Sequence, residues 1–333
     1  MEEERTVTGE LEPTDEAQQS AASVAVAAAT GPAEPPRRRK LLRAAAAVAL
    51  LLLLVGVAWE TAKLVGGDPW RYDSFLGSGI GFHHDPPLRI AQFSDRQLPH
   101  LWDIAGAMAA PVQRGQPQTL AEYLVGAALY TWRSAIIGFV VGALIGLTLA
   151  SIFVHFRLLE RAFVPYVIAS QAIPIVALAP MIVVGFGRDI TAVVIIATYL
   201  TFFPVTIAAM RGLSSPDPRA IELMRSYAAN RWAVFWKVRL PASVPYLFTA
   251  LKIAATASIV GAIIGEGPGG VRSGLGRAIL DFNQYYITGP ERLWAAILVS
   301  SLLGIAFFGL VRLAEGLVLR GRGRRARHPD PRR

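Results

Sequence analysis

Apolar residues lie in long blocks along this chain, separated by shorter polar segments. Six blocks hold one charged side chain between them, that of Lys252; the blocks are Ala44–Trp59, Ser134–Val154, Ala162–Gly187, Ile190–Met210, Val244–Gly265 and Leu293–Val311. A helix needs roughly 20 apolar residues to cross a bilayer, and a soluble helix keeps a polar face that these blocks lack. The pattern predicts an all-α polytopic membrane protein with about six transmembrane helices. A cleavable signal peptide is the alternative for the first block, which its long preceding segment disfavours.

The segments around the blocks indicate the domain organisation. Residues 1–36 are acidic and then rich in Ala and Pro, without an apolar period, which is typical of a disordered segment. The N-terminal part is predicted to comprise a disordered cytoplasmic tail (1–40), a first transmembrane helix (41–65) and an extracytoplasmic insertion (66–119). A core domain with five transmembrane helices (120–318) follows, and it includes a loop on the inside (211–243). A basic cytoplasmic tail (319–333) ends the chain.

The low content of charged residues supports a membrane protein, and their placement predicts its orientation. Charged residues make up 17% of the 333 residues, against about 25% in soluble domains. The net charge of +9 comes from arginines beside the blocks and at the C-terminus. Loops on the cytoplasmic side carry an excess of Lys and Arg, and the basic segments 37–43, 157–161, 211–239 and 312–333 share one side if the N-terminus is inside. We therefore expect both termini in the cytoplasm.

Two classes of function find no positive support. An ion-coupled secondary carrier places ionisable groups inside the membrane, and the blocks offer only Lys252, with Glu60 and Glu266 at span ends. A membrane enzyme needs a nucleophile with a base, or a metal cluster. No histidine lies in a block, and the adjacent His83 and His84 are expected to be solvent-exposed loop residues. We expect no catalytic residue and no metal site.

Energy for transport must then come from another chain. There is no cysteine, which excludes disulfides and thiolate sites, and no phosphate-binding Gly-x-x-x-x-Gly-Lys motif. We therefore expect this chain to bind no cofactor and to offer a docking surface to a separate ATPase.

The inside loop 211–243 has the pattern of such a surface. Asp217 is suited to cap a helix with Pro218 at its first position, and Pro241 is expected to end the helical segment. Apolar residues recur between them at helical spacing: Ile221, Met224, Tyr227, Ala228, Trp232, Phe235 and Val238. An interfacial helix lying on anionic lipid fits the same periodicity, so both interpretations stay open on the pattern alone.

The stretch Glu222–Pro241 resembles the EAA loop of bacterial ABC importer permeases. That loop has Glu-Ala-Ala, a following glycine and an Ile-x-Leu-Pro ending. Glu222, Leu240 and Pro241 match in register, and Val238 stands in place of Ile. The resemblance implies that the coupling helices seated on the ATPase comprise Glu222, Met224, Tyr227, Ala228, Arg231, Trp232, Val238, Leu240 and Pro241.

Three positions depart from the motif. Leu223 and Met224 replace the two alanines, and Ala228 replaces the glycine. The bulkier pair implies a locally different fit with the ATPase, and the lost glycine implies a less flexible bend between the two short helices.

The resemblance covers residues 98–320 and implies a type I ABC importer permease fold. Ala172–Pro174, Ala177–Pro180 and Gly185–Gly187 are similar to the nitrate, sulfonate and taurine branch, in which kinked helices line the translocation path. The candidates for that path are Gln171, Pro174, Pro180, Lys252 and Glu266. The alternatives stay open: the kinks serve packing alone, Lys252 has a structural role or snorkels, and Glu266 is a loop residue or a contact for the binding protein.

Gly138, Gly142 and Gly146 form a GxxxGxxxG face in the second block. Small residues let helix backbones approach closely. We expect this face to pack within the same subunit rather than to dimerise.

The family resemblance also implies the partners. These are two ABC ATPase subunits, which carry ATP and Mg, a second permease copy as homodimer or close heterodimer, an extracytoplasmic substrate-binding protein, and membrane lipid, with no nucleic acid. The expected location is the bacterial plasma membrane, and the expected mechanism is alternating access. The 66–119 insertion serves as a contact for the binding protein or as a passive surface loop.

Two segments indicate a substrate class. Ala169–Pro174 and Val260–Pro268 are similar to permeases for riboflavin or the pyrimidine precursor of thiamine, and Leu275–Ala278 and Trp294–Ala296 point the same way. A carboxylate at Glu266 also disfavours an anion nearby. A heterocycle is therefore favoured over sulfonate, taurine or nitrate.

Overall fold

A computed structural model describes residues 37–72, 82–112, 117–267 and 271–326. The chain divides into a unit of residues 1–61 and a unit of residues 62–333. The helix α2 (Arg37–Gly66) belongs mainly to the first unit, and its stretch Ala49–Gly66 is apolar and long enough to cross a membrane. The leucines at 50–54 are all more than half exposed, as expected of side chains that face lipid.

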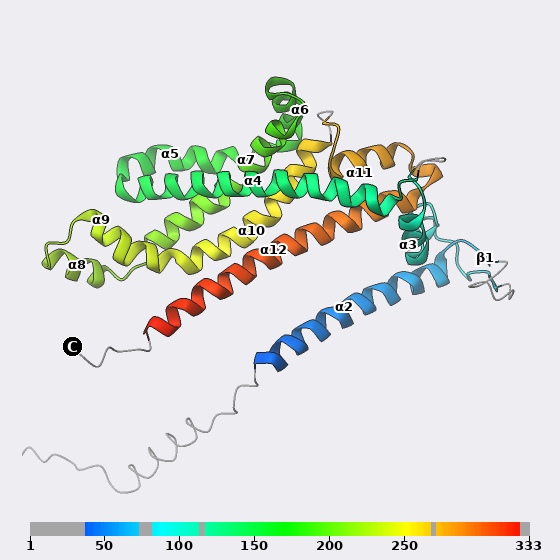
Figure 1. Cartoon of the computed structure of the whole chain (residues 1–333), viewed down its shortest axis with the longest axis horizontal. Helices are drawn as coiled ribbons and strands as arrows, with labels where there is room; N and C mark the ends of the chain where they lie inside the picture. The colour runs from blue at the N-terminus through cyan, green and yellow to red at the C-terminus, as the bar shows by residue number, and fades with distance from the viewer. Residues whose placement is uncertain (1–36, 73–81, 113–116, 268–270, 327–333) are drawn as a thin grey trace, which may run out of the picture. The chain divides into compact units, whose positions relative to one another are not determined.

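Long apolar helices dominate the second unit (Figure 1). They are α4 (Leu120–His155), α7 (Ile190–Leu213), α10 (Leu240–Glu266) and α12 (Pro290–Ala326). α4 begins at a capping box, because the Thr119 hydroxyl accepts the Glu122 N–H at 3.2 Å and the Glu122 carboxylate accepts the Thr119 N–H at 3.0 Å. α7 packs against both α4 and α10, and α10 also contacts α12. α7 is therefore the centre of the helix assembly.

Glycines bring α4 and α7 together. A Cβ at Gly138 would lie 2.4 Å from the Cβ of Ala197, and one at Gly142 would lie 2.6 Å from the Cβ of Thr201. A Cβ at Gly146 would lie 2.7 Å from the carbonyl oxygen of Phe202. The face formed by the three glycines is thus occupied by α7 of the same chain.

The third apolar block, Ala162–Gly187, forms a bent pair of helices. α5 (Arg157–Ser170) and α6 (Ile175–Phe186) meet at an angle of 96°, so the block counts as one span when the bent pair is taken together. Pro174 causes the break because it lacks an N–H and disfavours helical geometry in the residue before it. The Tyr199 hydroxyl donates to the Ser170 carbonyl and so satisfies an exposed end of α5. The described helices include five that can span a membrane alone, or six with this bent pair.

The 66–119 insertion contains two short strands and a helix. β1 (Trp70–Tyr72) pairs antiparallel with β2 (Phe82–His84), with Trp70 opposite His84, and a 3-10 turn covers Ala91–Phe93. α3 (Leu101–Ala109) follows Pro99 and packs against α12 and α4. Ile104 of α3 is buried in one cluster with residues of α4, α11 and α12. The insertion is therefore part of the hydrophobic core.

Short helices complete the unit. α8 (Pro218–Ser226) and α9 (Arg231–Val234) lie between α7 and α10, and a π-helical turn, Phe235–Arg239, joins α9 to α10. α11 (Leu275–Gln284) and a 3-10 turn, Tyr286–Thr288, lie between α10 and α12 at the end that carries α3 (Figure 1).

The glycine contact between α4 and α7 is testable. We expect Gly142→Ala to lower the stability of the protein by about 1–3 kcal/mol, because the new methyl group overlaps Thr201 and backbone atoms of α7. Gly126→Ala on the same helix is the control, since nothing lies within 4 Å of a Cβ there. Thermal unfolding in detergent measures both. Equal melting temperatures for the two variants would show that α4 and α7 are not in close contact at Gly142.

Candidate functional site

The break between α5 and α6 opens a cavity of about 370 Å³. Gln171 and Pro174, two of the predicted pathway residues, both line it, together with Tyr199 and Phe203 of α7. Its surface is mostly aliphatic and aromatic, and its polar side chains are those of Ser170, Gln171 and Tyr199. A cavity of this size and chemistry suits a small molecule held by apolar contact and oriented by a few hydrogen bonds.

The other pathway candidates lie elsewhere. Pro180 lies inside α6 and does not line the cavity. Lys252 of α10 donates to both carboxylate oxygens of Glu315 on α12, at 2.9 and 3.1 Å. A paired charge is the form in which an ionisable residue is tolerated in a membrane. The structure thus brings Gln171 and Pro174 together and leaves Lys252 in a separate ion pair, which sequence reasoning missed.

Glu266 forms a buried joint at the end of α10. Its Oε2 accepts the Thr131 hydroxyl of α4 at 2.8 Å and the Gly276 N–H of α11 at 3.0 Å. The same hydroxyl oxygen accepts the Leu275 N–H at 2.9 Å. The Glu266 side chain is fully buried, so neither an open loop position nor a contact for a binding protein fits it.

The chain passes very close to this carboxylate. Gly274 has a φ of +106°, and a Cβ there would lie 2.2 Å from the Glu266 carboxyl carbon. Only glycine fits both the backbone conformation and the space. Among the described residues, the Glu266 Oε1 has no hydrogen-bond partner. The joint therefore fixes three helices to one another through a single oxygen atom.

The segment 211–243 forms two short helices. The Asp217 carboxylate accepts the Arg219 N–H at 2.9 Å and Pro218 occupies the first turn, so the predicted start of α8 is confirmed. The Asn230 side chain caps α9 by accepting the Ala233 N–H at 2.7 Å. Both helices thus begin at a side-chain cap that satisfies a free backbone donor.

Ala228 keeps the bend that glycine provides in the resembled motif. Its φ is +54°, and it is the one non-glycine residue of the described chain with a positive φ. The Ala228 N–H bonds to the Arg225 carbonyl at 2.9 Å and the Ala229 N–H to the Met224 carbonyl at 3.0 Å. These two bonds form a Schellman motif, which ends α8. An alanine in this conformation is strained by its Cβ.

Pro241 does not end the helical segment, contrary to our prediction. The chain runs from α9 through the π turn into α10, and Pro241 lies in the first turn of α10. The Leu240 N–H bonds back to the Phe235 carbonyl, which widens the turn ahead of the proline. Proline is tolerated in a first turn because its missing N–H needs no partner there.

The segment has a buried and an exposed side. Phe235 is buried in a cluster with Ala150 and Leu213. Leu223, Tyr227 and Trp232 are 59, 78 and 65% exposed, and Glu222 is exposed as well. Large apolar side chains exposed within one short segment are typical of a surface that another molecule covers.

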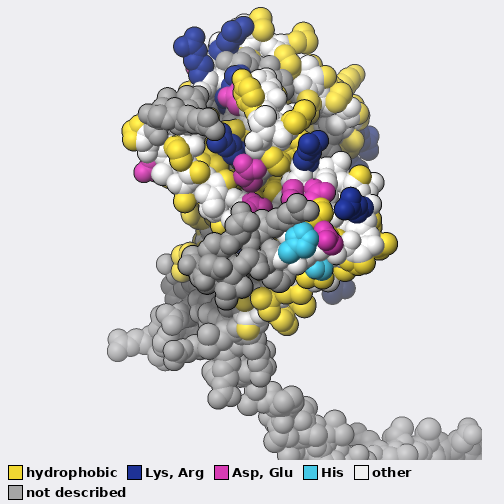
Figure 2. Space-filling model, turned by 90° about the vertical axis from the view of Figure 1, so that its right-hand side faces the viewer, with side chains coloured by type: hydrophobic (Ala, Val, Ile, Leu, Met, Phe, Trp, Pro, Cys, Tyr) yellow, Lys and Arg dark blue, Asp and Glu magenta, His cyan; other side chains and the backbone are white. Residues whose placement is uncertain are grey.

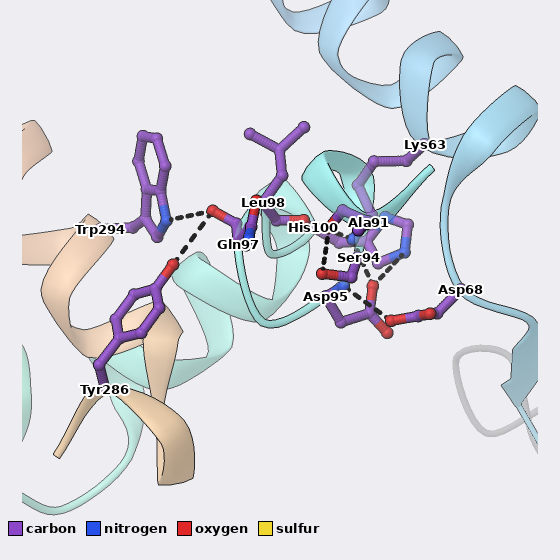
Figure 3. A network of polar contacts seen from close by, with 10 residues as sticks. All are labelled: Lys63, Asp68, Ala91, Ser94, Asp95, Gln97, Leu98, His100, Tyr286 and Trp294. Atoms are coloured by element: carbon purple, nitrogen blue, oxygen red, sulfur yellow. Dashed lines mark hydrogen bonds and ion pairs between the residues drawn. The ribbon is translucent and has the colours of Figure 1, made fainter. Parts of the chain in front are cut away.

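At the opposite end of the unit, a polar network holds the 66–119 insertion (Figure 3). Lys63 is fully buried and donates to the Asp95 carboxylate and, at 2.6 Å, to the Leu98 carbonyl. The Gln97 carbonyl accepts the Trp294 indole N–H at 3.1 Å and the Tyr286 hydroxyl at 3.3 Å. The network therefore ties the insertion to α12 and to the turn before it. Sequence reasoning missed it, although a lysine at the end of an apolar block is a signal.

Acidic residues line a cavity of about 530 Å³ beside this network. They are Asp95, Asp103 and Glu291, and acidic side chains gather on this face in Figure 2. Burial raises the pKa of the Asp103 carboxyl, while the nearby His100 lowers it. The His83 side chain is 53% exposed, with its Nε2 3.0 Å from the Asp85 carboxylate. The predicted exposure is confirmed, but the predicted loop position is wrong because His83 lies in β2.

Comparisons with known proteins agree with this architecture. Residues 127–319 match the family model for the inner membrane component of binding-protein-dependent transport systems. The chain is 34% identical over 186 residues to the formylaminopyrimidine transport permease of Halalkalibacterium halodurans, covering 55% of this chain and 72% of that protein. It is 34% identical over 166 residues to the riboflavin transport system permease of Chloroflexus aurantiacus, covering 50% and 61%. It is 26% identical over 188 residues to a putative aliphatic sulfonates permease of Bacillus subtilis, covering 56% and 67%.

The strained bend at Ala228 is testable. We expect Ala228→Gly to raise the stability of the protein by about 0.5–1 kcal/mol, because glycine adopts a positive φ without a clash of its Cβ. Ala229→Gly is the control and should be neutral or destabilising. Thermal unfolding of both purified variants in detergent gives the comparison. A lower melting temperature for Ala228→Gly would mean that α8 does not end in a left-handed residue.

The joint at Glu266 gives a second test. We expect Glu266→Ala to lower stability by about 1–3 kcal/mol, because the Thr131 hydroxyl and the Gly276 N–H lose a buried acceptor. Glu266→Gln keeps an acceptor oxygen and nearly the same volume, so it should cost less. Hydrogen exchange at residues 271–284 should speed up in the alanine variant alone. Unchanged exchange there would remove Glu266 from this role.

Proposed function

Because the chain belongs to the family of inner membrane components of binding-protein-dependent transport systems, it is the permease subunit of an ABC importer, and we propose that its cargo is a small neutral heterocycle. Riboflavin and formylaminopyrimidine, which appear in the names of two relatives, represent this class.

The observation that carries the proposal is the lining of the cavity at the α5–α6 break. It offers the aromatic faces of Tyr199, Phe202 and Phe203, with the Gln171 amide beside them, and no charged residue of the described chain lines it. Aromatic rings stack with flat heterocycles, and an amide both donates and accepts hydrogen bonds. An oxyanion taken out of water needs cationic partners or several N–H donors, whereas the described residues of this lining hold no cation and Gln171 is their one side-chain N–H donor.

An aliphatic sulfonate is the second candidate. It is favoured by the Bacillus subtilis relative and by the likeness of Ala172–Pro174 and Ala177–Pro180 to the sulfonate and taurine branch. The apolar surface of the cavity suits an aliphatic chain, but the sulfonate group would need a partner from outside the lining.

The proposed mechanism is alternating access in a pair of permease copies. An extracytoplasmic binding protein delivers the cargo, and two ATPase subunits, which bind ATP and Mg, close on the cytoplasmic side. The exposed side chains of Leu223 and Tyr227 support the proposal that the segment 211–243 docks on an ATPase. The arginines of that segment and of both tails support a cytoplasmic position for it and for the termini.

The helix geometry supports transmission of the movement. α9 continues through the π turn into α10, so a displacement of the docking segment moves α10 directly. α10 has 27 residues, about 40 Å at 1.5 Å per residue. It connects the proposed ATPase contact at one end with the Glu266 joint at the other.

Cargo class is tested first on the cognate binding protein and then on the permease. We expect riboflavin or a pyrimidine, and not taurine, alkanesulfonates or nitrate, to raise the melting temperature of the binding protein. Uptake of that compound into proteoliposomes with the complete transporter should fall about tenfold in Gln171→Leu, since the lost hydrogen bond leaves a polar group unpaired. Gln284→Leu, an exposed residue at the end of α11, is the control. A shift with an oxyanion alone would overturn the heterocycle proposal.

A further inference from the structure

A basic pocket lies where α4 ends beside α8 and α9. Its volume is about 480 Å³, and the side chains of Arg157, Arg225, Arg231 and Arg239 line it together with His155. One arginine comes from the start of α5, and the other three come from the segment between α7 and α10, which begins more than 50 residues later. The fold thus concentrates positive charge at one point.

These arginines lack acidic partners within the described chain. Glu160, Asp217 and Glu222, the carboxylates of the same segments of sequence, form no ion pair with them, although ion pairs occur elsewhere in the described residues. Arg239 donates to the Leu213 carbonyl at 3.0 Å and has further N–H groups to offer. Like charges held close together repel, so an anion bound in the pocket would reduce the electrostatic repulsion between the arginines.

An apolar groove of about 500 Å³ adjoins the pocket, and the two share His155 and Arg231. Leu147 and Ile152 of α4 line the groove on one side, and Trp232 and Trp236 line it on the other. Both tryptophans are at least 60% exposed. Tryptophan is enriched at the boundary between lipid and water.

The groove runs into the membrane-spanning part of α4. Leu147 precedes His155 by eight residues, about 12 Å along the helix. A soluble partner that docks from the cytoplasm would not fill the part of the groove that lies within the membrane. An acyl chain fills it, while the phosphate at its end reaches the arginines.

We propose that this site binds an anionic phospholipid of the cytoplasmic leaflet, with its phosphate in the arginine pocket and an acyl chain in the groove. The planar guanidinium group suits phosphate oxygens, and basic pockets on the cytoplasmic side of membrane helices suit anionic headgroups. The cytoplasmic assignment rests on the function proposed above. The bound lipid would join the end of α4 to the segment between α7 and α10, and so hold that segment in position.

The test uses the full-length permease in a neutral detergent, without ATPase, binding protein or cargo. Native mass spectrometry and thermal unfolding are measured with phosphatidylglycerol, with phosphatidylcholine, and with inorganic phosphate or glycerol phosphate. We expect phosphatidylglycerol to bind and to raise the melting temperature, and the other additions to have little effect at the same concentration. Arg157→Gln with Arg225→Gln should weaken the binding of phosphatidylglycerol by at least roughly tenfold.

Two variants separate the parts of the site. Arg219→Gln, on α8 but outside the pocket, is the matched control and should bind phosphatidylglycerol like the wild type. Ile152→Glu should abolish lipid binding through the groove while the arginines remain. A lipid that binds equally to wild type and to the double arginine variant would overturn the proposal. Equal protection by inorganic phosphate would identify a free-anion site instead.

In a separate binding assay with the cognate ATPase, a loss of ATPase binding in the double variant, together with no lipid effect in the wild type, would assign the pocket to the ATPase and reject the lipid. Because no cargo is present, an error in the proposed substrate class leaves these results unchanged. The two proposals therefore fail independently.

Discussion

The close contact between α4 and α7 is the constraint on which the rest of the second unit depends. Apolar helices in lipid gain nothing from the hydrophobic effect when they meet, so fit and backbone proximity must hold them together. The glycines of α4 provide this fit, because any added Cβ would overlap α7. Once α7 is fixed against α4, its other face receives α10, which in turn contacts α12.

Side-chain contacts at both ends of α10 then hold it against the neighbouring helices. Glu266 joins α10 to α4 and α11 at one end, and the Phe235 side chain is buried beside α4 and α7 at the other. Between these ends α10 is one continuous helix. In the proposed mechanism it transmits the movement of the docking segment to the end that carries Glu266. α6 packs against α7 and α10, and the cavity lies where the chain turns between α5 and α6.

The membrane helices could be predicted because a spanning helix is recognised from the apolar composition of about 20 consecutive residues. The apolar blocks gave the membrane helices, and the Asp217–Pro218 cap followed from local chemistry. The helix break at Pro174 and the helix that continues through Pro241 could not be predicted from composition. The effect of a proline depends on whether its missing N–H falls inside a helix or in a first turn.

The buried polar contacts were beyond sequence reasoning for another reason. Thr131 and Glu266 are 135 residues apart, and Lys63 and Leu98 are 35 apart, so only the fold brings them together. The roles of Gln171, Pro174 and Pro180 in the translocation path, and of the loop residues in coupling, stay predictions. The structure places Gln171 and Pro174 at one cavity.

The pair formed by Lys252 and Glu315 bears on how the protein is made. The lysine is synthesised 63 residues before its partner, so a newly inserted α10 holds an uncompensated cation in the membrane until α12 arrives. A charge at the centre of a spanning helix costs about 2.5–3.5 kcal/mol during insertion. Insertion of α12 is therefore the step that compensates the charge of Lys252, and a nascent chain stopped before residue 315 would keep that charge unpaired in the membrane.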